Sequence, residues 1–388
     1  MPDFDIKHRK LRMAMIGGGG ISLNHRQAAR LDGEIELVAG AFSSNPEKSA
    51  ELGKRLHLDP VRVYGDWREM LAAEAARPAG ERVDLVSIVT PNFLHFEPAK
   101  AALEAGFHVV LDKPMTLNLE EARVLYDVAS KSGKVFALTH TYVGYPMVKL
   151  ARDLIKRGHL GKIRKVIVEY ISSYLYKNLD GEARMAWRTD PAKAGSGCLG
   201  DIGTHAAILS ETVTGLRITE VAAEVSTFVE GRRTDDDTAM LVHWENGVKG
   251  TLNATGIATG EENEIAIYVY GDKAGLEWQH VECEHLKVRY PNRPMEVWSR
   301  GHGYVAEASP SAARVSRLDP NHPEGNIEAF ANIYINAAHA IREVESGRPL
   351  AEVEKDFPGI EEGLRGMLFV AAAQESSNAH GKWTRLQS

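Results

Sequence analysis

Glycines and a serine at fixed spacing give the first indication of chemistry in this chain. Gly17, Gly19 and Ser22 follow the apolar run Leu11 to Ile16. In the spacing Gly-x-Gly-x-x-small, the first glycine makes a tight turn, the second lets a pyrophosphate approach the backbone, and the small residue lets a helix and a strand pack closely. The alternative is an ordinary tight turn. Between a strand and a helix, the stretch predicts a dinucleotide-binding loop made of Gly17, Gly19, Gly20, Ile21 and Ser22.

The end of the second predicted strand bears on the choice of dinucleotide. An acidic residue that binds the adenosine ribose of NAD normally stands there. This chain has Ser43 and Ser44 instead, followed by Lys48. Hydroxyl groups and an ammonium suit a 2'-phosphate, which an aspartate would repel. The cofactor is therefore expected to be NAD or NADP, with NADP favoured; in the alternative, the serines cap a helix and Lys48 is a solvated charge.

Two further apolar runs end in polar residues. Thr90, Pro91 and Asn92 close one run, and Asp112 and Lys113 close the next. Parallel sheets bind ligands at the carboxyl ends of their strands, so both ends are candidate ligand contacts. A lysine between an apolar strand and a proline cannot easily swing away, and its ammonium is expected to point toward the ligand. A solvated lysine at a strand end is the alternative.

Asp201 and His205 lie four residues apart in a glycine-rich stretch. On a helix this spacing puts the two side chains on one face, and the helix dipole favours an ionised aspartate in the first turn. A histidine oriented by a carboxylate is a good proton acceptor near neutral pH. The pair predicts a general base, and a core histidine with a satisfied hydrogen bond is the alternative. Close packing against the backbone is expected at Gly195, Gly197, Gly200 and Gly203.

Short apolar runs that alternate with helical patterns must position the residues up to about position 140. This order is typical of a parallel sheet with helices on both faces. The predicted strands are Leu11 to Ile16, Ile35 to Ala41, Val83 to Val89, His108 to Leu111 and Val135 to Leu138. The predicted helices are His25 to Leu31, Pro46 to Leu56, Trp67 to Ala76, Glu97 to Ala105 and Leu119 to Ser130, with Asn45 and Asn118 as caps.

The pattern changes near Tyr145, after which one helix is followed by longer alternating segments suited to antiparallel strands. The predicted helix is Met147 to Arg157, and the predicted strands are Ile163 to Ser172, Ile218 to Val229, Thr238 to Trp244, Gly247 to Ala254 and Glu264 to Tyr270, with a hairpin turn at Glu245 to Gly247. Residues 289–323 are expected to form a long loop.

The predicted fold class is α/β, with an N-terminal Rossmann doubly wound parallel sheet and a C-terminal α+β domain that has a large, mostly antiparallel sheet. A chain of 388 residues suits about two domains. We expect a dinucleotide-binding domain at 1–145 and a substrate-binding and oligomerisation domain at 146–388.

Composition argues against several classes of function. The net charge of -7 and the absence of a long basic run argue against nucleic acid as a partner. No stretch approaches the roughly 20 apolar residues that span a bilayer, and the charged start lacks the apolar centre of a secretory signal. Cys198 and Cys283 are too few for a disulfide scaffold, and no metal-ligand cluster of the Cys-x-x-Cys type occurs. The expected location is the cytoplasm, and Cys198 is expected to be a packing residue.

Together these motifs resemble the Gfo/Idh/MocA oxidoreductase family. The matching stretches are GGGGIS at 17–22, TPNFLH at 90–95, DKP at 112–114, WR at 187–188 and GCLGDIGTH at 197–205. The resemblance implies a hydride passing between a sugar or polyol carbon and nicotinamide. It implies that His205 is the general base, that Lys113 stabilises negative charge on the reacting oxygen, and that Asp201 orients His205 and binds a hydroxyl. It adds three residues to the cofactor site: His95, Trp187 and Arg188.

Two departures from the family pattern concern the cofactor and the substrate. Asp112 stands where glutamate is usual, which shortens the side chain expected to contact the cofactor ribose. Thr141 stands where some relatives carry arginine or asparagine, so a substrate carboxylate has no clamp there. We therefore expect a neutral ring polyol: an inositol, an anhydrosugar such as levoglucosan, or a glycoside. Its expected contacts are Lys113, Thr141, Tyr142, Asp201, His205 and His322.

Family precedent also implies a homodimer or homotetramer. Three alternatives stay open at the level of sequence. One is a non-catalytic dinucleotide-binding regulator, although such proteins can lose the lysine or the histidine that this chain keeps. Another is a reductase of a non-sugar carbonyl, and the last is an oxidoreductase that recycles a tightly held cofactor between two sugars.

Overall fold

The computed structural model describes residues 9–178 and 187–387. The charged residues 1–8, part of the start that argues against a secretory signal, lie outside this range. The described residues form two units, one of residues 9–141 and 327–364 and the other of residues 142–178, 187–326 and 365–387. Residues 327–364, which the expected limits put in the second domain, cluster with the first unit. The limits 1–145 and 146–388 stay a prediction of where independently folding parts begin and end.

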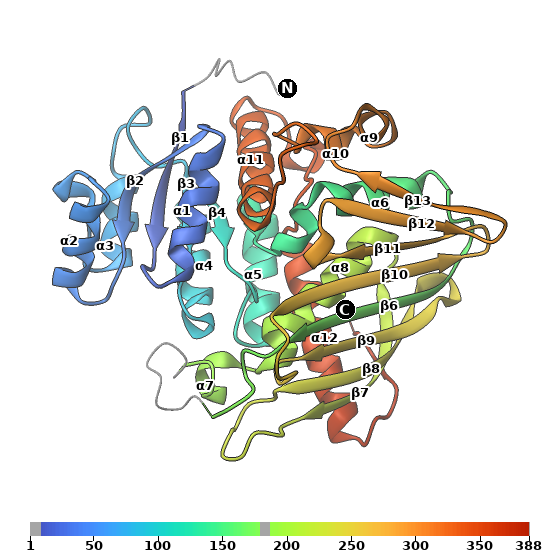
Figure 1. The fold of residues 1–388 in the computed structure, drawn as a ribbon. Helices are drawn as coiled ribbons and strands as arrows, with labels where there is room; N and C mark the ends of the chain where they lie inside the picture. Colours follow the sequence, from blue (N-terminus) through green and yellow to red (C-terminus); the bar gives the residue numbers. More distant parts are fainter. Residues whose placement is uncertain (1–8, 179–186, 388) are drawn as a thin grey trace. The chain divides into compact units, whose positions relative to one another are not determined.

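The first unit has a five-stranded parallel sheet with the strand order β2-β1-β3-β4-β5 (Figure 1). Its central strands β3 and β4 are buried along their whole length, because helices cover both faces of a parallel sheet. The predicted Rossmann sheet is therefore confirmed. Its strands are β1 (Leu11–Ile16), β2 (Ile35–Ala41), β3 (Leu85–Ile88), β4 (His108–Leu111) and β5 (Phe136–Leu138).

Two helices of the first unit, α2 and α5, begin at the predicted caps. Asn45 accepts a hydrogen bond from the amide of Lys48, and Asn118 accepts one from the amide of Glu121. Apolar residues of the last helix, such as Phe330, are buried. The helices are α1 (Ile21–Leu31), α2 (Pro46–Arg55), α3 (Trp67–Ala75), α4 (Phe96–Glu104), α5 (Leu119–Ser132) and α11 (Asn326–Glu345), and the short 3-10 turns are η1 (Pro60–Arg62), η2 (Asn92–Leu94) and η7 (Leu350–Glu352).

The second unit has a nine-stranded sheet with the order β13-β12-β11-β10-β6-β9-β8-β7-β14. Only β6 and β9 pair in parallel, so the predicted large and mostly antiparallel sheet is confirmed. The strands are β6 (Ile163–Ser172), β7 (Ile218–Ser226), β8 (Asp237–Trp244), β9 (Lys249–Thr255), β10 (Asn263–Gly271), β11 (Gly275–Gln279), β12 (His285–Tyr290), β13 (Arg293–Ser299) and β14 (Thr384–Arg385). The predicted hairpin turn joins β8 to β9 at η5 (Glu245–Gly247).

Helices of the second unit lie against one face of this sheet (Figure 1). Along β8 and β9 buried residues alternate with more exposed ones, which is the pattern of a sheet covered on one side. Helix α8 packs on β6, β9 and β10. The helical elements are α6 (Pro146–Lys156), α7 (Pro191–Ala194), the π-helical turn η4 (Leu199–Gly203), α8 (Thr204–Thr214), α9 (Gly303–Ala308), α10 (Pro310–Arg314) and α12 (Ile360–Asn378); η3 (Thr141–Gly144) and η6 (His280–Glu282) are 3-10 turns.

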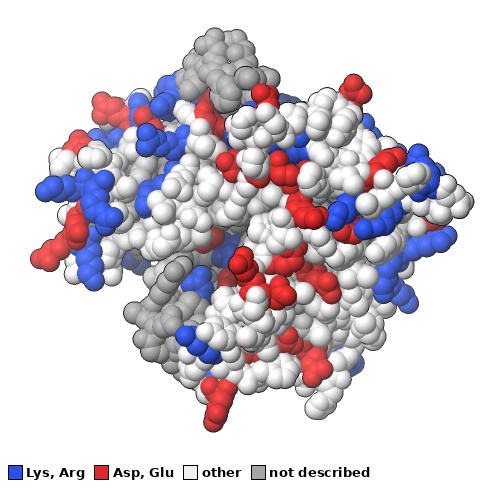
Figure 2. All heavy atoms as spheres, viewed as in Figure 1, with Lys and Arg blue, Asp and Glu red and all other residues white. Residues whose placement is uncertain are grey.

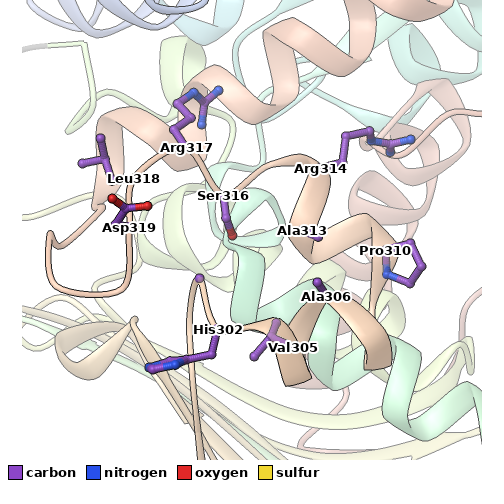
Figure 3. A pocket seen from close by; sticks show the side chains of 11 residues that line it. His302, Val305, Ala306, Pro310, Ala313, Arg314, Ser316, Arg317, Leu318 and Asp319 are labelled. Carbon is purple, nitrogen blue, oxygen red and sulfur yellow. The ribbon is translucent and has the colours of Figure 1, made fainter. Parts of the chain in front are cut away.

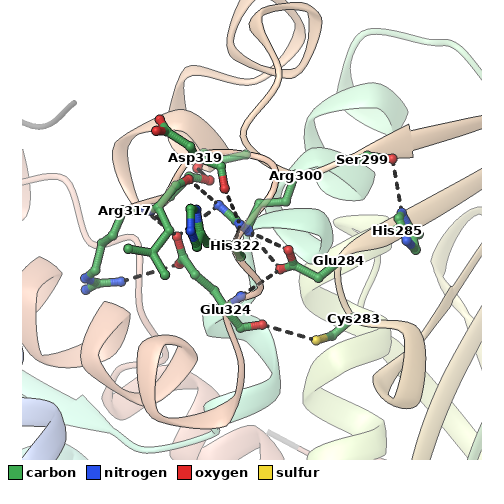
Figure 4. Close-up of polar contacts among 12 residues, drawn as sticks. Cys283, Glu284, His285, Ser299, Arg300, Arg317, Asp319, His322 and Glu324 are labelled. Carbon is green, nitrogen blue, oxygen red and sulfur yellow. Dashed lines mark hydrogen bonds and ion pairs between the residues drawn. The ribbon is translucent and has the colours of Figure 1, made fainter.

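The prediction of one long loop at 289–323 was wrong, because β13, α9 and α10 lie within it. Polar contacts that are remote in sequence stabilise this region. Arg300 is 1% exposed and binds the carboxylates of Glu284 and Glu324 and the carbonyl of Leu318 (Figure 4). Beside this cluster, residues of α9, α10 and the following turn line a pocket of about 460 Å³, with His302 and Asp319 among them (Figure 3).

Three patterns are relevant in the described residues: a gathering of one sign of charge, a membrane-spanning helix and a group of metal ligands. On the face in Figure 2, basic side chains form separate groups with acidic side chains between them. Among residues 9–178 and 187–387, no helix combines the length and the apolar character that crossing a membrane requires. The same residues contain no group of three or more His, Cys, Asp or Glu placed to hold a metal ion.

Candidate active site

The loop between β1 and α1 has the backbone geometry that a bound pyrophosphate requires. Gly17 has a φ of 103°, and a Cβ added there would lie 2.9 Å from the carbonyl oxygen of Val89. A Cβ on Gly19 would meet nothing within 4 Å, so the backbone is open at that point. Helix α1 begins without a side-chain cap and without an acidic residue in its first turn. The positive end of its dipole is thus available to an anion, and the residues present fit a dinucleotide.

Ser22 closes this loop onto itself. Its hydroxyl donates to the carbonyl of Gly19 at 2.6 Å and accepts from Arg26 at 2.7 Å. At the end of β2, the hydroxyl of Ser43 accepts from the amide of Asn45, while Ser44 and Lys48 are exposed. Ser43 thus makes a local backbone contact, whereas the cap of α2 is Asn45 and not one of the serines.

The connection after β3 is braced by a buried histidine. The two ring nitrogens of His95 lie 2.8 Å from the carbonyl oxygens of Thr90 and Pro114. Burial lowers the pKa of His95, against the opposite effect of the Asp112 charge. The ring therefore joins the ends of β3 and β4 through their backbones, and direct contact of His95 with a cofactor stays a prediction, as it does for Pro91 and the buried Asn92.

Asp112 ends β4 with a carboxylate that several groups hold. Its Oδ1 accepts from the amide of Lys113 at 2.9 Å and from the hydroxyl of Thr139 at 2.9 Å, and it lies 3.8 Å from Nε2 of His25. Burial opposes ionisation, but His25, Lys113 and His95 outweigh it and hold the pKa of the Asp112 carboxyl well below its usual range. Asp112 is therefore a carboxylate at neutral pH, as a ribose contact requires.

Lys113 follows Asp112 and is partly exposed. On the neighbouring strand end lies His140, whose side chain is buried. Burial and, to a lesser extent, the charge of Lys113 lower the pKa of His140 to about 3. Thr141, the predicted substrate contact, is buried, and its hydroxyl donates to the carbonyl of Thr139 at 3.5 Å.

In the second unit, Asp201 and His205 lie on consecutive helical elements. Asp201 belongs to the π-helical turn η4, and His205 is the second residue of α8. The expected single α-helix is thus replaced by a wider turn followed by a helix; π-helical turns often occur at functional sites. His205 is 6% exposed, and the side chain of Asp201 is 23% exposed.

A carboxylate that the sequence analysis missed holds this segment. Asp235 accepts hydrogen bonds at 2.6 Å from the amides of Gly197 and Leu199, and its carbonyl accepts from the amide of Cys198. A Cβ on Gly197 would lie 1.9 Å from the carbonyl oxygen of Asp235, so the predicted close packing against this backbone is confirmed at that glycine. The thiol of Cys198 is buried and donates to the carbonyl of Ala254, as expected of a packing residue.

Hydroxyl groups gather beside His205. The ring of Tyr142 meets the His205 ring edge to face, with centroids 4.9 Å apart. The hydroxyl of Tyr142 lies 2.5 Å from that of Tyr170, which donates to Asn263, and the amide of Asn263 donates back to Tyr142. Burial raises the pKa of Tyr170 well above its usual value, so the three groups form a neutral, closed hydrogen-bond ring. Tyr170 carries no sequence signal beyond its place on a predicted strand, and Asn263 lies one residue before the predicted strand Glu264 to Tyr270, at the start of β10.

Asp201 has aromatic and cationic neighbours. Nε of Arg188 lies 3.8 Å from its carboxylate, and the guanidinium of Arg188 stacks on the ring of Trp187. The hydroxyl of Tyr174 is buried and has no hydrogen-bond partner in the described part of the chain. Burial and then the charge of Asp201 raise the pKa of Tyr174 well above its usual value. A neutral donor and a carboxylate acceptor therefore lie in the same region.

His322 is exposed, and its carbonyl accepts from Arg300 in the cluster of Figure 4. Its role as a substrate contact stays a prediction, as do the roles of the other site residues. Lys113 belongs to the first unit, and Asp201 and His205 belong to the second.

Comparison with known proteins gives the family of both parts of the chain. Residues 11–140 match the model of the oxidoreductase family with an NAD-binding Rossmann fold. Residues 148–277 match the model of the GFO/IDH/MocA C-terminal domain.

Three similar proteins cover most of the chain. An uncharacterized oxidoreductase of Bacillus subtilis is 34% identical over 98% of this chain and 98% of its own length. An inositol dehydrogenase homolog of Azotobacter vinelandii, solved with NADH and myo-inositol, is 34% identical with a TM-score of 0.89, and the match covers 97% of this chain and 98% of that one. The levoglucosan dehydrogenase of Pseudarthrobacter phenanthrenivorans is 27% identical over 73% of this chain and 77% of its own length.

Proposed function

Because the chain belongs to the Gfo/Idh/MocA oxidoreductase family, we propose that it oxidises a secondary ring hydroxyl of a neutral sugar or cyclic polyol. The substrate class is an inositol, an anhydrosugar such as levoglucosan, or a glycoside. The relatives solved or named with inositol and levoglucosan support this class.

A nicotinamide dinucleotide would bind to the first unit. Gly17, Gly19 and the start of α1 would hold its pyrophosphate, and Asp112 would contact a ribose hydroxyl. When bound, the nicotinamide supplies the hydride acceptor, since the side chains of the protein cannot accept a hydride. The glycine geometry and the open start of α1 support this assignment.

The side chains of the protein would move the proton and stabilise charge. His205 would accept the proton of the reacting hydroxyl as general base, and Asp201 would orient it and accept a hydrogen bond from a substrate hydroxyl. The ammonium of Lys113 would hydrogen-bond the reacting oxygen and stabilise its developing negative charge. Trp187 and Arg188 would contribute to cofactor binding, as the family resemblance implies.

The main support for this substrate class is the hydrogen-bonded group of Tyr142, Tyr170 and Asn263 beside His205. Tyr142, Tyr170 and Asn263 satisfy one another and present no net charge, and the edge of the Tyr142 ring lies against the base. Tyr174 adds a buried hydroxyl without a partner in the described range, next to the Asp201 region. A polyhydroxylated ring can donate to Asp201 and accept from Tyr174, which supports a neutral polyol.

The choice of cofactor is a separate part of the proposal. Ser43, Ser44 and Lys48 support NADP by their chemistry, but Ser43 already accepts a local amide hydrogen bond. The relative from Azotobacter vinelandii was solved with NADH, which supports NAD. We therefore propose that the protein is active with NAD. Tighter binding of NADP than of NAD remains a hypothesis, which titration with both cofactors can test. Assembly into a homodimer or homotetramer is likewise proposed from family precedent.

A substrate screen tests the function directly. Inositols, anhydrosugars and glycosides are incubated with NAD or NADP, and the absorbance of the reduced nicotinamide is followed. We expect activity with at least one neutral ring polyol, and a loss of about a hundredfold or more in Lys113→Ala or His205→Ala with cofactor affinity retained. Near-normal turnover in both variants contradicts the assigned roles. Cofactor that copurifies with the protein and is not exchanged between turnovers favours the recycling alternative.

A further inference from the structure

A buried chain of polar side chains in the first unit has no role in the chemistry proposed so far. The hydroxyl of Tyr334 on α11 lies 2.7 Å from Nδ1 of His25 on α1 and 2.8 Å from Oγ of Ser87 on β3. All three residues are at most 1% exposed. Phe330 packs edge to face on the imidazole, with centroids 4.7 Å apart. Because water does not reach these groups, the hydrogen-bond donors and acceptors must be matched within the chain.

Counting hydrogens fixes the direction of this chain. The hydroxyl of Tyr334 has one hydrogen and two neighbours. If it donates to Ser87, the hydroxyl hydrogen of Ser87 has no acceptor among its contacts in the described residues. If Tyr334 donates to Nδ1 of His25 instead, Ser87 donates to Tyr334 and every hydroxyl hydrogen is used. The arrangement that uses both hydroxyl hydrogens therefore runs from Ser87 through Tyr334 to His25.

This direction decides which nitrogen of His25 carries the hydrogen. Nδ1 accepts, so the neutral imidazole has its hydrogen on Nε2. Nε2 has no hydrogen-bond partner within the described residues, and it lies 3.8 Å from Oδ1 of Asp112. A bare nitrogen lone pair facing that carboxylate would be repelled, whereas an N–H directed toward it is attracted.

The contacts of the Asp112 carboxylate are concentrated on Oδ1. The amide of Lys113 and the hydroxyl of Thr139 donate to Oδ1, and Nε2 of His25 faces the same oxygen. The hydrogen bonds that Lys113 and Thr139 make to the Asp112 side chain both end on Oδ1, and this side chain is 14% exposed. Two hydrogen bonds and the facing Nε2 of His25 thus lie at Oδ1, which leaves Oδ2 as the oxygen that can accept from a ligand.

We propose that His25 is a positioning residue for Asp112, kept in its Nε2–H form by Tyr334 and Ser87, and that it thereby presents Oδ2 to a hydroxyl group of the dinucleotide. This inference rests on the proposed function, in which Asp112 contacts a cofactor ribose. It also gives a role to residues 327–364, since α11 supplies the hydroxyl that decides the form of His25.

Nitrogen NMR of the protein without cofactor tests the first half of the proposal. With ¹⁵N-labelled histidine, long-range proton–nitrogen spectra separate Nδ1–H, Nε2–H and doubly protonated rings, and the His25→Gln spectrum assigns the signals. We expect His25 to be neutral with its hydrogen on Nε2, and we expect a mixed or altered form in Tyr334→Phe. A doubly protonated ring or an Nδ1–H ring in the unaltered protein overturns the proposal.

Direct titration with NADH, followed by fluorescence, tests the second half. Tyr334→Phe keeps the ring and removes both hydrogen bonds of the buried hydroxyl, so we expect affinity for NADH to fall about fivefold to tenfold, with a smaller change in kcat at saturating cofactor. Tyr268→Phe in the other unit removes a tyrosine hydroxyl that accepts from Gln279, and it serves as the matched control with unchanged affinity.

Three outcomes separate the ideas. Unchanged NADH affinity in Tyr334→Phe overturns the positioning role. Equal losses in Tyr334→Phe and Tyr268→Phe also overturn it, because they indicate a general loss of stability. Failure of the unaltered protein to bind either NADH or NADPH contradicts the proposed function and the role of Oδ2 with it, while the NMR result tests the hydrogen-bond chain in either case. Ser87→Ala, which removes the first donor, provides a second variant if Tyr334→Phe does not fold.

Discussion

Replacing Asp235 with alanine removes the carboxylate that holds the segment before Asp201 and His205. In the second unit this carboxylate accepts from the amides of Gly197 and Leu199, each at 2.6 Å. The substitution leaves the carbonyl of residue 235 in place to accept from Cys198. The substitution therefore tests whether the hydrogen bonds from Gly197 and Leu199 to this carboxylate position the π-helical element η4.

The magnitude follows from the two hydrogen bonds and from burial. A hydrogen bond to a charged acceptor contributes about 1.5–3 kcal/mol, so two contribute about 3–6 kcal/mol. Burial raises the pKa of the Asp235 carboxyl even though the amides of Leu199 and Gly197 oppose that shift, so part of the gain is offset by desolvation. We expect Asp235→Ala to lower the free energy of unfolding by about 3 kcal/mol.

Turnover is expected to fall further than stability alone would explain. A misplacement of about 1 Å in a catalytic group can reduce the rate about a hundredfold. We expect kcat to fall by about that factor in Asp235→Ala, with NADH affinity unchanged because the dinucleotide loop lies in the other unit. Urea denaturation measures stability, steady-state kinetics on the substrate found by the screen measures kcat, and fluorescence titration measures affinity. Asp235→Asn keeps one acceptor oxygen, and we expect its stability and its kcat to lie between those of the unaltered protein and those of Asp235→Ala.

The matched control is the next residue along the chain. Asp236 is also buried, and its carboxylate accepts from the amides of Phe228 at 2.9 Å and Val229 at 3.1 Å. Asp236→Ala is expected to lose at least as much stability, because it also removes the carboxylate that faces the buried Arg232. We expect less than about a fivefold change in kcat in this variant, because the Asp236 side chain holds a turn remote in sequence from η4. Equal losses of kcat in the two alanine variants, or normal kcat in Asp235→Ala, refute the positioning argument.

Three further predictions concern pH and the cofactor loop. Burial and Lys113 lower the pKa of His140 to about 3 in the folded protein. Below the ordinary histidine pKa of about 6.5, the unfolded chain therefore takes up a proton at His140 that the folded chain does not. This difference should make the protein about 1.4 kcal/mol less stable at pH 5.5 than at pH 7.5. Denaturation at both pH values should show this extra loss in the unaltered protein and not in His140→Gln, and equal losses contradict it. Gly17→Ala should weaken NADH binding at least about tenfold, because alanine disfavours the φ of 103° and its Cβ would approach the Val89 carbonyl. The control is Gly80→Ala, where an added Cβ meets nothing within 4 Å, and this variant should bind NADH normally in the same titration. Ser43→Asp should weaken NADP more than NAD in parallel titrations, and equal effects remove the basis for favouring NADP.

Local patterns in the sequence were enough to predict most elements near the candidate site. The predicted strands Leu11 to Ile16, Ile35 to Ala41 and His108 to Leu111 match β1, β2 and β4 residue for residue. The caps Asn45 and Asn118 act as predicted, because capping depends on residues only three positions apart. The loop at 17–22 was likewise predictable from its glycine spacing, because the turn, the open backbone and the start of the helix all lie within these residues.

Contacts between residues remote in sequence could be found only in the tertiary structure. Asp235 lies 38 residues from Gly197, and Tyr334 lies 309 residues from His25. Neither pair leaves a periodic pattern or a motif, because one carboxylate or hydroxyl is enough to make the bond. The same holds for Arg300, whose buried contacts order a region that the sequence predicted to be a loop.

The sequence by itself thus determined the two fold types, the glycine spacing of the predicted dinucleotide loop and the residue types available for proton transfer. The tertiary structure alone decided which buried groups hold those residues and that residues 327–364 cluster with the Rossmann sheet. The physical reason is that helices, strands, caps and tight turns depend on neighbours within a few positions. Burial, hydrogen-bond direction and the pKa of a side chain depend on what the fold places around it.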